Sequence, residues 1–157
     1  MMTRHDLWPS RLAACIASAR ERPYRLGEWD CPTFVAACIE AMTGVDVRSH
    51  FRGHYHDIAS ARAWMRAFSR GGQLAEAASI VAARIGAPLI PVKLAGRGDV
   101  VLIDLRDAAG LAEGGPGHMD GDEALGVVDL DGRRALFPAP RGFTALPLRL
   151  CKLAWRI

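Results

Sequence analysis

The sequence predicts a single α+β domain over residues 1–157, with helices in the first half and an antiparallel β-sheet in the second. Apolar residues recur at helical spacing as far as about residue 85, and short apolar runs bounded by Gly, Pro and Asp follow them. A chain of 157 residues is long enough for one domain that buries about two-thirds of its unfolded surface.

Four stretches have the apolar spacing of a helix, and a proline or a glycine after each one ends it. We expect these helices at residues 6–21, 32–43, 57–70 and 74–85. The residues expected to face the core from the third helix are Ile58, Ala61, Met65 and Phe68.

Short apolar runs in the second half predict strands. The pair Asp131–Gly132 is typical of a tight hairpin turn, and the strands from residue 124 onward are expected to form an antiparallel meander. Residues 106–123 form a glycine-rich segment without periodicity, which is typical of a functional loop or of a mobile one, and the sequence does not decide between them. The expected strands are 99–103, 124–129, 133–137, 143–148 and 150–156.

Charge and composition argue against several classes of function. The net charge is +3 and the arginines are spread among acidic residues, so we expect no nucleic-acid partner. No stretch approaches the ~20 apolar residues that cross a bilayer, and residues 1–8 lack the apolar segment of a secretion signal. We therefore expect no membrane span, and synthesis and folding in a cytoplasm. The four cysteines lack metal-finger spacing and are expected to be reduced, and no cofactor is expected.

The most informative segment is WDCPTF, residues 29–34. Proline favours the first position of a helix, which predicts that Cys31 is the N-cap, facing unpaired backbone amides and the positive end of the helix dipole. Both effects stabilise a thiolate, which is the nucleophilic form of cysteine. The alternative is a small buried cysteine that packs under Trp29 and has no chemical role.

Several elements accompany this segment: RPYRLGEWDC at 22–31, FRGHY at 51–55, the strand that starts at Gly98–Asp99, and AWR at 154–156. They resemble an uncharacterised branch, encoded beside phage and prophage tail genes, of the NlpC-type (papain-like) superfamily of cell-wall cysteine peptidases. The resemblance to the superfamily itself rests on the order of three motifs: DCxxF at 30–34, GDVVL at 98–102 and LGVVDLDG at 125–132.

The resemblance implies a papain-like fold, with N-terminal helices packed on a C-terminal antiparallel sheet, and hydrolysis of peptidoglycan stem peptides. Cys31 would be the nucleophile, backbone amides would form the oxyanion hole, and Asp30, Trp29 and Tyr24 would lie at the substrate groove. It also implies other phage tail proteins and peptidoglycan as partners. The protein would reside in the bacterial cytoplasm before assembly and in the virion tail afterwards.

The sequence departs from the family pattern at the catalytic base. The family places a histidine at the head of a strand where this chain has Ala124, and nothing polar stands at Phe137–Pro138, where the third catalytic member follows. An alanine transfers no proton, and losing general acid–base help typically costs about 10²- to 10⁴-fold in rate. His118 in the glycine-rich segment is the candidate displaced base, with Asp122 or Glu123 to orient it; an exposed loop histidine is the alternative.

Three hypotheses about function remain open at this point. The first is a degenerate but active tail-borne peptidoglycan hydrolase that uses Cys31. The second is a catalytically inactive structural or adaptor component of the phage tail tip. The third is a thiol-dependent amidase or acyltransferase unconnected with phage, which also needs a base for the thiol.

Three neighbouring histidines form the other conspicuous cluster. Imidazole and carboxylate groups bind zinc, which makes this cluster, together with Asp57, a weak candidate for a metal site. Gly53 interrupts any regular helix face between His50 and His54. We therefore expect a basic strip at the surface or along a groove, and no metal, at His50, His54 and His56.

Overall fold

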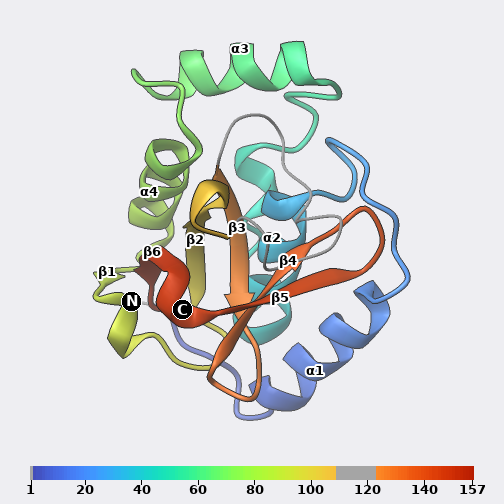
Figure 1. The fold of residues 1–157 in the computed structure, drawn as a ribbon, viewed down its shortest axis with the longest axis vertical. Helices are drawn as coiled ribbons and strands as arrows, with labels where there is room; N and C mark the ends of the chain where they lie inside the picture. The colour runs from blue at the N-terminus through green and yellow to red at the C-terminus, as the bar shows by residue number, and fades with distance from the viewer. Residues whose placement is uncertain (1, 109–122) are drawn as a thin grey trace.

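The structure, a computed structural model, describes residues 2–108 and 123–157 (Figure 1). Within these residues four α-helices precede the main strands, and the fold is α+β, as predicted. The helices are α1 (Trp8–Ala19), α2 (Cys31–Thr43), α3 (Ile58–Phe68) and α4 (Leu74–Ile85). The strands are β1 (Leu89–Ile90), β2 (Val100–Asp104), β3 (Glu123–Val128), β4 (Arg134–Pro138), β5 (Phe143–Pro147) and β6 (Cys151–Trp155). No helix in the described part of the chain has both the length and the apolar character needed to cross a membrane.

The sheet has the strand order β1-β6-β2-β3-β4-β5, and its neighbouring strands are antiparallel. β2 to β5 form a meander, with the Asp131–Gly132 turn between β3 and β4 as predicted. The predicted place of the last strand is wrong, because β6 does not continue the meander beside β5. It returns across the sheet to lie between β1 and β2, where Ala154 pairs with Val101 in the buried interior.

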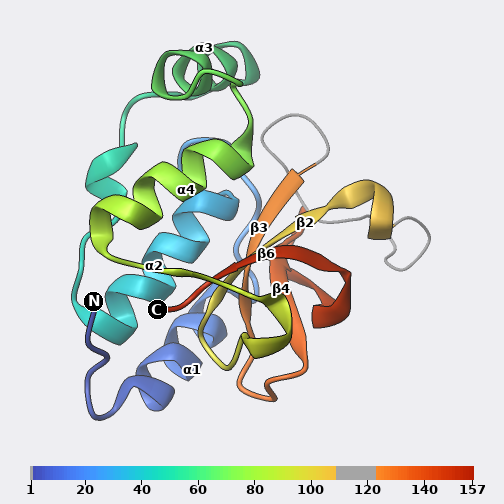
Figure 2. The ribbon, with the colours of Figure 1, turned by 90° about the vertical axis from the view of Figure 1, so that its left-hand side faces the viewer.

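Both faces of the sheet are buried at its central strands, β2 and β3. Side chains alternate between the faces of a strand, so Val100 and Leu102 join one apolar core with the helices, whereas Val101 and Ile103 join a second core. The helices lie along one side of the sheet (Figure 2). Burial on both faces explains why the sequences of β2 and β3 are continuous apolar runs and do not alternate with polar residues.

Local signals set the helix boundaries. The side chain of Asp57 caps the start of α3 in a capping box, and Gly44 ends α2 in the left-handed conformation with φ 77°. Two of the core positions expected on α3, Ala61 and Met65, are buried. Ile58 is 52% exposed, contrary to prediction, because the first residue of the helix points away from the core.

A buried carboxylate joins the two ends of the described chain. Asp99, which is 1% exposed, pairs with the guanidinium groups of Arg4 at 2.8 Å and Arg156 at 3.0 Å. It also accepts a hydrogen bond from the backbone N–H of Ile157 at 3.1 Å, and Arg4 donates to the Ile157 carbonyl at 2.7 Å. A buried charge is tolerated only with such partners, and these contacts hold residues 4 and 157 side by side.

Candidate functional site

The start of α2 is built around Asp30, which is the N-cap of the helix. Its Oδ1 accepts a hydrogen bond from the backbone N–H of Thr33 at 3.0 Å, and the Thr33 hydroxyl accepts one from the backbone N–H of Asp30 at 2.6 Å. The prediction that Cys31 is the N-cap is therefore wrong. A carboxylate is a strong capping acceptor and a thiol a weak one, so Cys31 and Pro32 become the first two helical residues.

The Asp30 carboxylate is fully buried and satisfied by donors from three segments. Its Oδ2 accepts hydrogen bonds from the backbone N–H of Gly27 at 2.9 Å and from the hydroxyl of Tyr55 at 2.7 Å. Its Oδ1 accepts hydrogen bonds from the backbone N–H and the hydroxyl of Thr33. Burying a carboxylate is costly unless it is hydrogen-bonded in this way. The carboxylate thus links α2, the loop before it and the segment that contains Tyr55.

Close packing at Gly27 completes this arrangement. The residue has φ 82°, and a Cβ atom there would lie 2.6 Å from the backbone oxygen of Tyr55. Only glycine combines that backbone conformation with so near an approach.

The Cys31 thiol is fully buried. Burial raises its pKa above the ordinary value, and the neighbouring Asp30 carboxylate raises it further; hydrogen bonds from the backbone of Leu125 and of Cys31 itself oppose these effects. We expected the helix start to lower this pKa, and the structure gives the opposite direction. Desolvation and the adjacent negative charge outweigh the amides, so the group is a neutral thiol.

The other residues expected to line a groove lie around this thiol and are largely covered. Trp29 is 4% exposed, with its indole between the guanidinium of Arg22, 4.1 Å from the ring centroid, and the ring of Phe34. Tyr24 is half-buried, and burial and the nearby Cys31 raise its pKa. Among the described residues, neither the Tyr24 hydroxyl nor the Trp29 Nε1 has a hydrogen-bond partner.

The described residues supply no imidazole to the Cys31 sulfur. His118 and Asp122, the candidate base and one candidate orienting group, lie outside the described residues. Ala124 is fully buried in the second core, whereas Cys31 lies in the first, so the family's base position contributes only a methyl group to the interior. Glu123 pairs with Lys152 at 2.5 Å and orients no imidazole in the described structure.

The three histidines of the sequence cluster do not converge. His54 stacks on Trp64 with ring centroids 6.1 Å apart, and His56 lies 3.4 Å from the Asp57 carboxylate. His50 lies on a separate short 3₁₀ turn. Within residues 2–108 and 123–157, no group of three or more His, Cys, Asp or Glu side chains is arranged to hold a metal ion.

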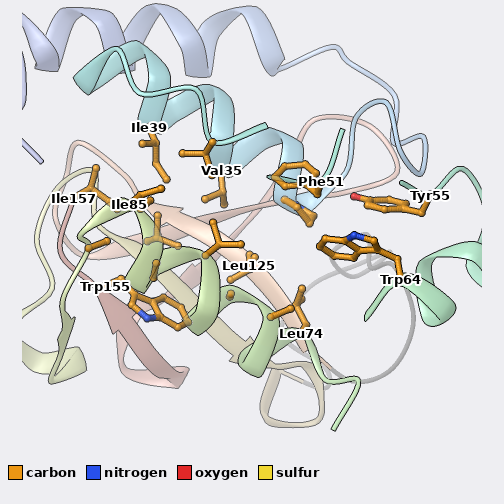
Figure 3. Close-up of a pocket in the computed structure, with 18 residues that line it drawn as sticks. Val35, Ile39, Phe51, Tyr55, Trp64, Leu74, Ile85, Leu125, Trp155 and Ile157 are labelled. Carbon is orange, nitrogen blue, oxygen red and sulfur yellow. The ribbon is translucent and has the colours of Figure 1, made fainter. Parts of the chain in front are cut away.

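An apolar pocket that the sequence analysis missed lies beside the start of α2, with a volume of about 70 Å³ (Figure 3). Pro32 and Tyr55 line it next to the Cys31 segment, and Trp64 and Trp155 line it from α3 and β6. Only the alanine-rich face of α4 signals this pocket in the sequence, because small side chains leave space between a helix and a sheet. The α4 residues that line it are Leu74, Ala77, Ala78, Val81, Ala82 and Ile85.

One comparison with known proteins gives a match, and that match covers nearly the whole chain. A family model described as Domain of unknown function (DUF6950) matches residues 3–157. The chain belongs to the DUF6950 family. A comparison with curated proteins finds no match.

The chemistry open to this DUF6950 domain follows from what surrounds the sulfur. A buried neutral thiol beside a carboxylate is a poor nucleophile, and the described residues bring no imidazole to it that would remove its proton. The pocket, in turn, offers apolar contact without charged side chains. The described site is therefore suited to packing and to holding segments together.

Proposed function

We propose that this DUF6950 domain is a non-hydrolytic structural or adaptor component of a phage or prophage tail, built on a papain-like fold of the NlpC type. The resemblance of residues 22–31 and 51–55 to the tail-associated branch supports the location and the fold type. The observation that supports the absence of hydrolysis is the complete burial of the Cys31 thiol.

Because Cys31 is buried, it fails two requirements of thiol catalysis. The sulfur of a cysteine hydrolase must reach the carbonyl carbon of its substrate and must be a thiolate when it attacks. Cys31 is 0% exposed, and both its burial and the Asp30 carboxylate raise its pKa. With alanine at position 124, the described chain also lacks the base that would offset this shift.

The same residues have a clear structural role. Asp30 caps α2 and receives hydrogen bonds from Gly27 and Tyr55, which lie on two different loops. In this proposal the segment that is catalytic in cysteine peptidases serves here as a structural junction, and Cys31 fills the space beneath it.

A second candidate is a peptidoglycan hydrolase that uses Cys31. The observation in its favour is that backbone N–H groups of Leu125 and Cys31 hydrogen-bond to the sulfur, since an oxyanion hole is built from such donors beside a nucleophile. This candidate needs a base from outside the described residues, and His118 is the one that the sequence offers.

Incubation with purified peptidoglycan separates the two candidates. Release of soluble fragments is measured for the unmodified chain, for Cys31→Ala and for His118→Ala, with lysozyme as the positive control. We expect release at the level of buffer alone for all three chains. Release by the unmodified chain that is lost in Cys31→Ala would overturn the proposal and establish the second candidate.

The tail location has its own test. Particles produced from a lysogen that carries the gene are purified, and their proteins are identified by mass spectrometry. We expect the chain in the particles, and we expect unchanged infectivity when Cys31→Ala replaces the normal chain. Absence of the chain from purified particles would overturn the assignment to the tail.

A further inference from the structure

Two of the four cysteines face each other across the contact between α1 and α2. The Sγ atoms of Cys15 and Cys38 lie 3.8 Å apart, although 23 positions separate the residues in the sequence. Cys15 is partly exposed, whereas Cys38 is fully buried. The pair lies apart from the Asp30 network and from the apolar pocket, whose lining includes neither residue.

The two thiols differ in reactivity in a way that suits sequential chemistry. A hydrogen bond from Cys38 and the nearby guanidinium of Arg48 lower the pKa of Cys15. Burial and the same contact raise the pKa of Cys38. Cys15 is therefore the thiol that solvent reaches and that ionises first, and Cys38 is the thiol placed to react with the oxidised product.

We propose that Cys15 and Cys38 form an oxidative modification site, at which a peroxide converts the two thiols into a disulfide that links α1 to α2. The Cys15 thiolate attacks one peroxide oxygen, the O–O bond breaks, and hydroxide leaves, which gives a sulfenic acid. The Cys38 sulfur then attacks the Cys15 sulfur, the S–O bond breaks, and the hydroxyl departs with the Cys38 proton as water. Two thiols and one hydrogen peroxide thus give one disulfide and two waters.

Formation of this disulfide requires little movement of the two helices. The sulfur atoms must approach from 3.8 Å to about 2.0 Å, which side-chain rotation and a small shift of two packed helices can supply. No other pair of cysteine sulfurs in the described chain is in contact: Cys31 lies at the start of α2 and Cys151 lies in the second core. Oxidation is therefore expected to give one defined product.

The linkage would restrain the helix that carries Cys31. A disulfide that closes a loop of this length stabilises a domain mainly by restricting its unfolded chain. We expect the midpoint of thermal unfolding to rise by roughly 5–10 °C on oxidation. This effect does not depend on whether the domain acts in a tail.

The test is a count of thiols in the full chain. The folded protein is treated with hydrogen peroxide, unfolded, alkylated with iodoacetamide and analysed by intact mass and peptide mapping. Four alkylated cysteines are expected before treatment and two after it, with Cys15 and Cys38 joined in one cross-linked peptide. Cys151→Ala is the matched control and should change from three alkylated cysteines to one.

Variants of the pair complete the test. Neither Cys15→Ser nor Cys38→Ala should form the cross-link or show a rise in unfolding temperature after treatment. Cys15→Ser should keep three alkylated cysteines, whereas in Cys38→Ala the oxidised Cys15 has no partner thiol and escapes alkylation, which leaves two. Four alkylated cysteines in the treated unmodified chain would overturn the proposal. Accumulation of sulfinic acid at Cys15 without a cross-link in the unmodified chain, or a disulfide between any other pair, would also overturn it.

Discussion

The hydroxyl of Tyr55 donates a 2.7 Å hydrogen bond to the buried carboxylate of Asp30, which caps the helix that Cys31 begins. This contact brings the FRGHY segment and the WDCPTF segment together, although 25 positions separate the two residues in the sequence. Two sequence motifs that a resemblance groups together are thus joined by one physical interaction.

Tyr55→Phe removes one donor from a buried carboxylate and preserves the packing of the ring. We expect a loss of about 1–3 kcal/mol in the free energy of unfolding, measured by urea denaturation. Tyr24→Phe is the matched control, because the Tyr24 hydroxyl has no hydrogen-bond partner among the described residues. Equal losses in the two variants would contradict a specific role for the Tyr55 hydroxyl.

Gly27→Ala tests the close approach beneath the same network. The added Cβ would lie 2.6 Å from the Tyr55 backbone oxygen, so the two loops must separate. Gly53→Ala is the control, since Gly53 has a similar φ of 78° but nothing within 4 Å of the added atom. We expect Gly53→Ala to lose about 1 kcal/mol from backbone strain alone, and Gly27→Ala to lose clearly more in the same denaturation assay.

Labelling with a thiol reagent at several pH values tests the environment of Cys31. The thiol is buried and its pKa is raised, so we expect no labelling in the folded protein and no acceleration between pH 7 and pH 9, where an ordinary thiol ionises. Burial also raises the pKa of Cys151 to about 12, so Cys15 should account for the rapid phase. Rapid labelling that disappears in Cys31→Ala but persists in Cys15→Ser would refute this picture.

The turn between β3 and β4 gives a pH dependence with a defined sign. Hydrogen bonds from the backbone of Arg133 and from the side chain and backbone of Arg134 lower the pKa of Asp131 to about 2. A carboxyl group whose pKa is lower in the folded state than in the unfolded state stabilises the fold above the unfolded value, which is about 4. That contribution is lost as the pH falls toward 2.

The measurement compares the unmodified chain with Asp131→Asn by thermal unfolding between pH 6 and pH 2. We expect the unmodified chain to be the more stable at pH 6 and the difference to disappear toward pH 2. A difference that is constant over this range would show that the charge of Asp131 does not contribute.

Local chemistry made the helices predictable from the sequence, whereas contacts between residues far apart in the sequence decided the order of the strands. Asp57 and Gly44 mark helix ends through their own side chain and backbone, so the α2 and α3 boundaries are close to those expected. The place of β6 depends on which strand edge buries Ala154 and Trp155, which no short segment specifies.

The candidate site could be predicted only in part, because contacts between residues far apart in the sequence also shape it. The importance of the WDCPTF segment follows from its residues, but the choice of Asp30 as the cap depends on competition between two adjacent acceptors. The burial of Cys31 depends on how α2 packs within the first core, and the direction of its pKa shift follows from that burial and from the adjacent Asp30 carboxylate. Likewise, the proximity of Cys15 to Cys38 depends on how α1 packs on α2.

The Asp99 carboxylate has a mechanical consequence. Since Arg4, Arg156 and Ile157 all contact it, a pull applied between residues 4 and 157 loads these ionic contacts before it loads any strand of the meander. A domain under tension between residues 4 and 157 would therefore yield first at this junction.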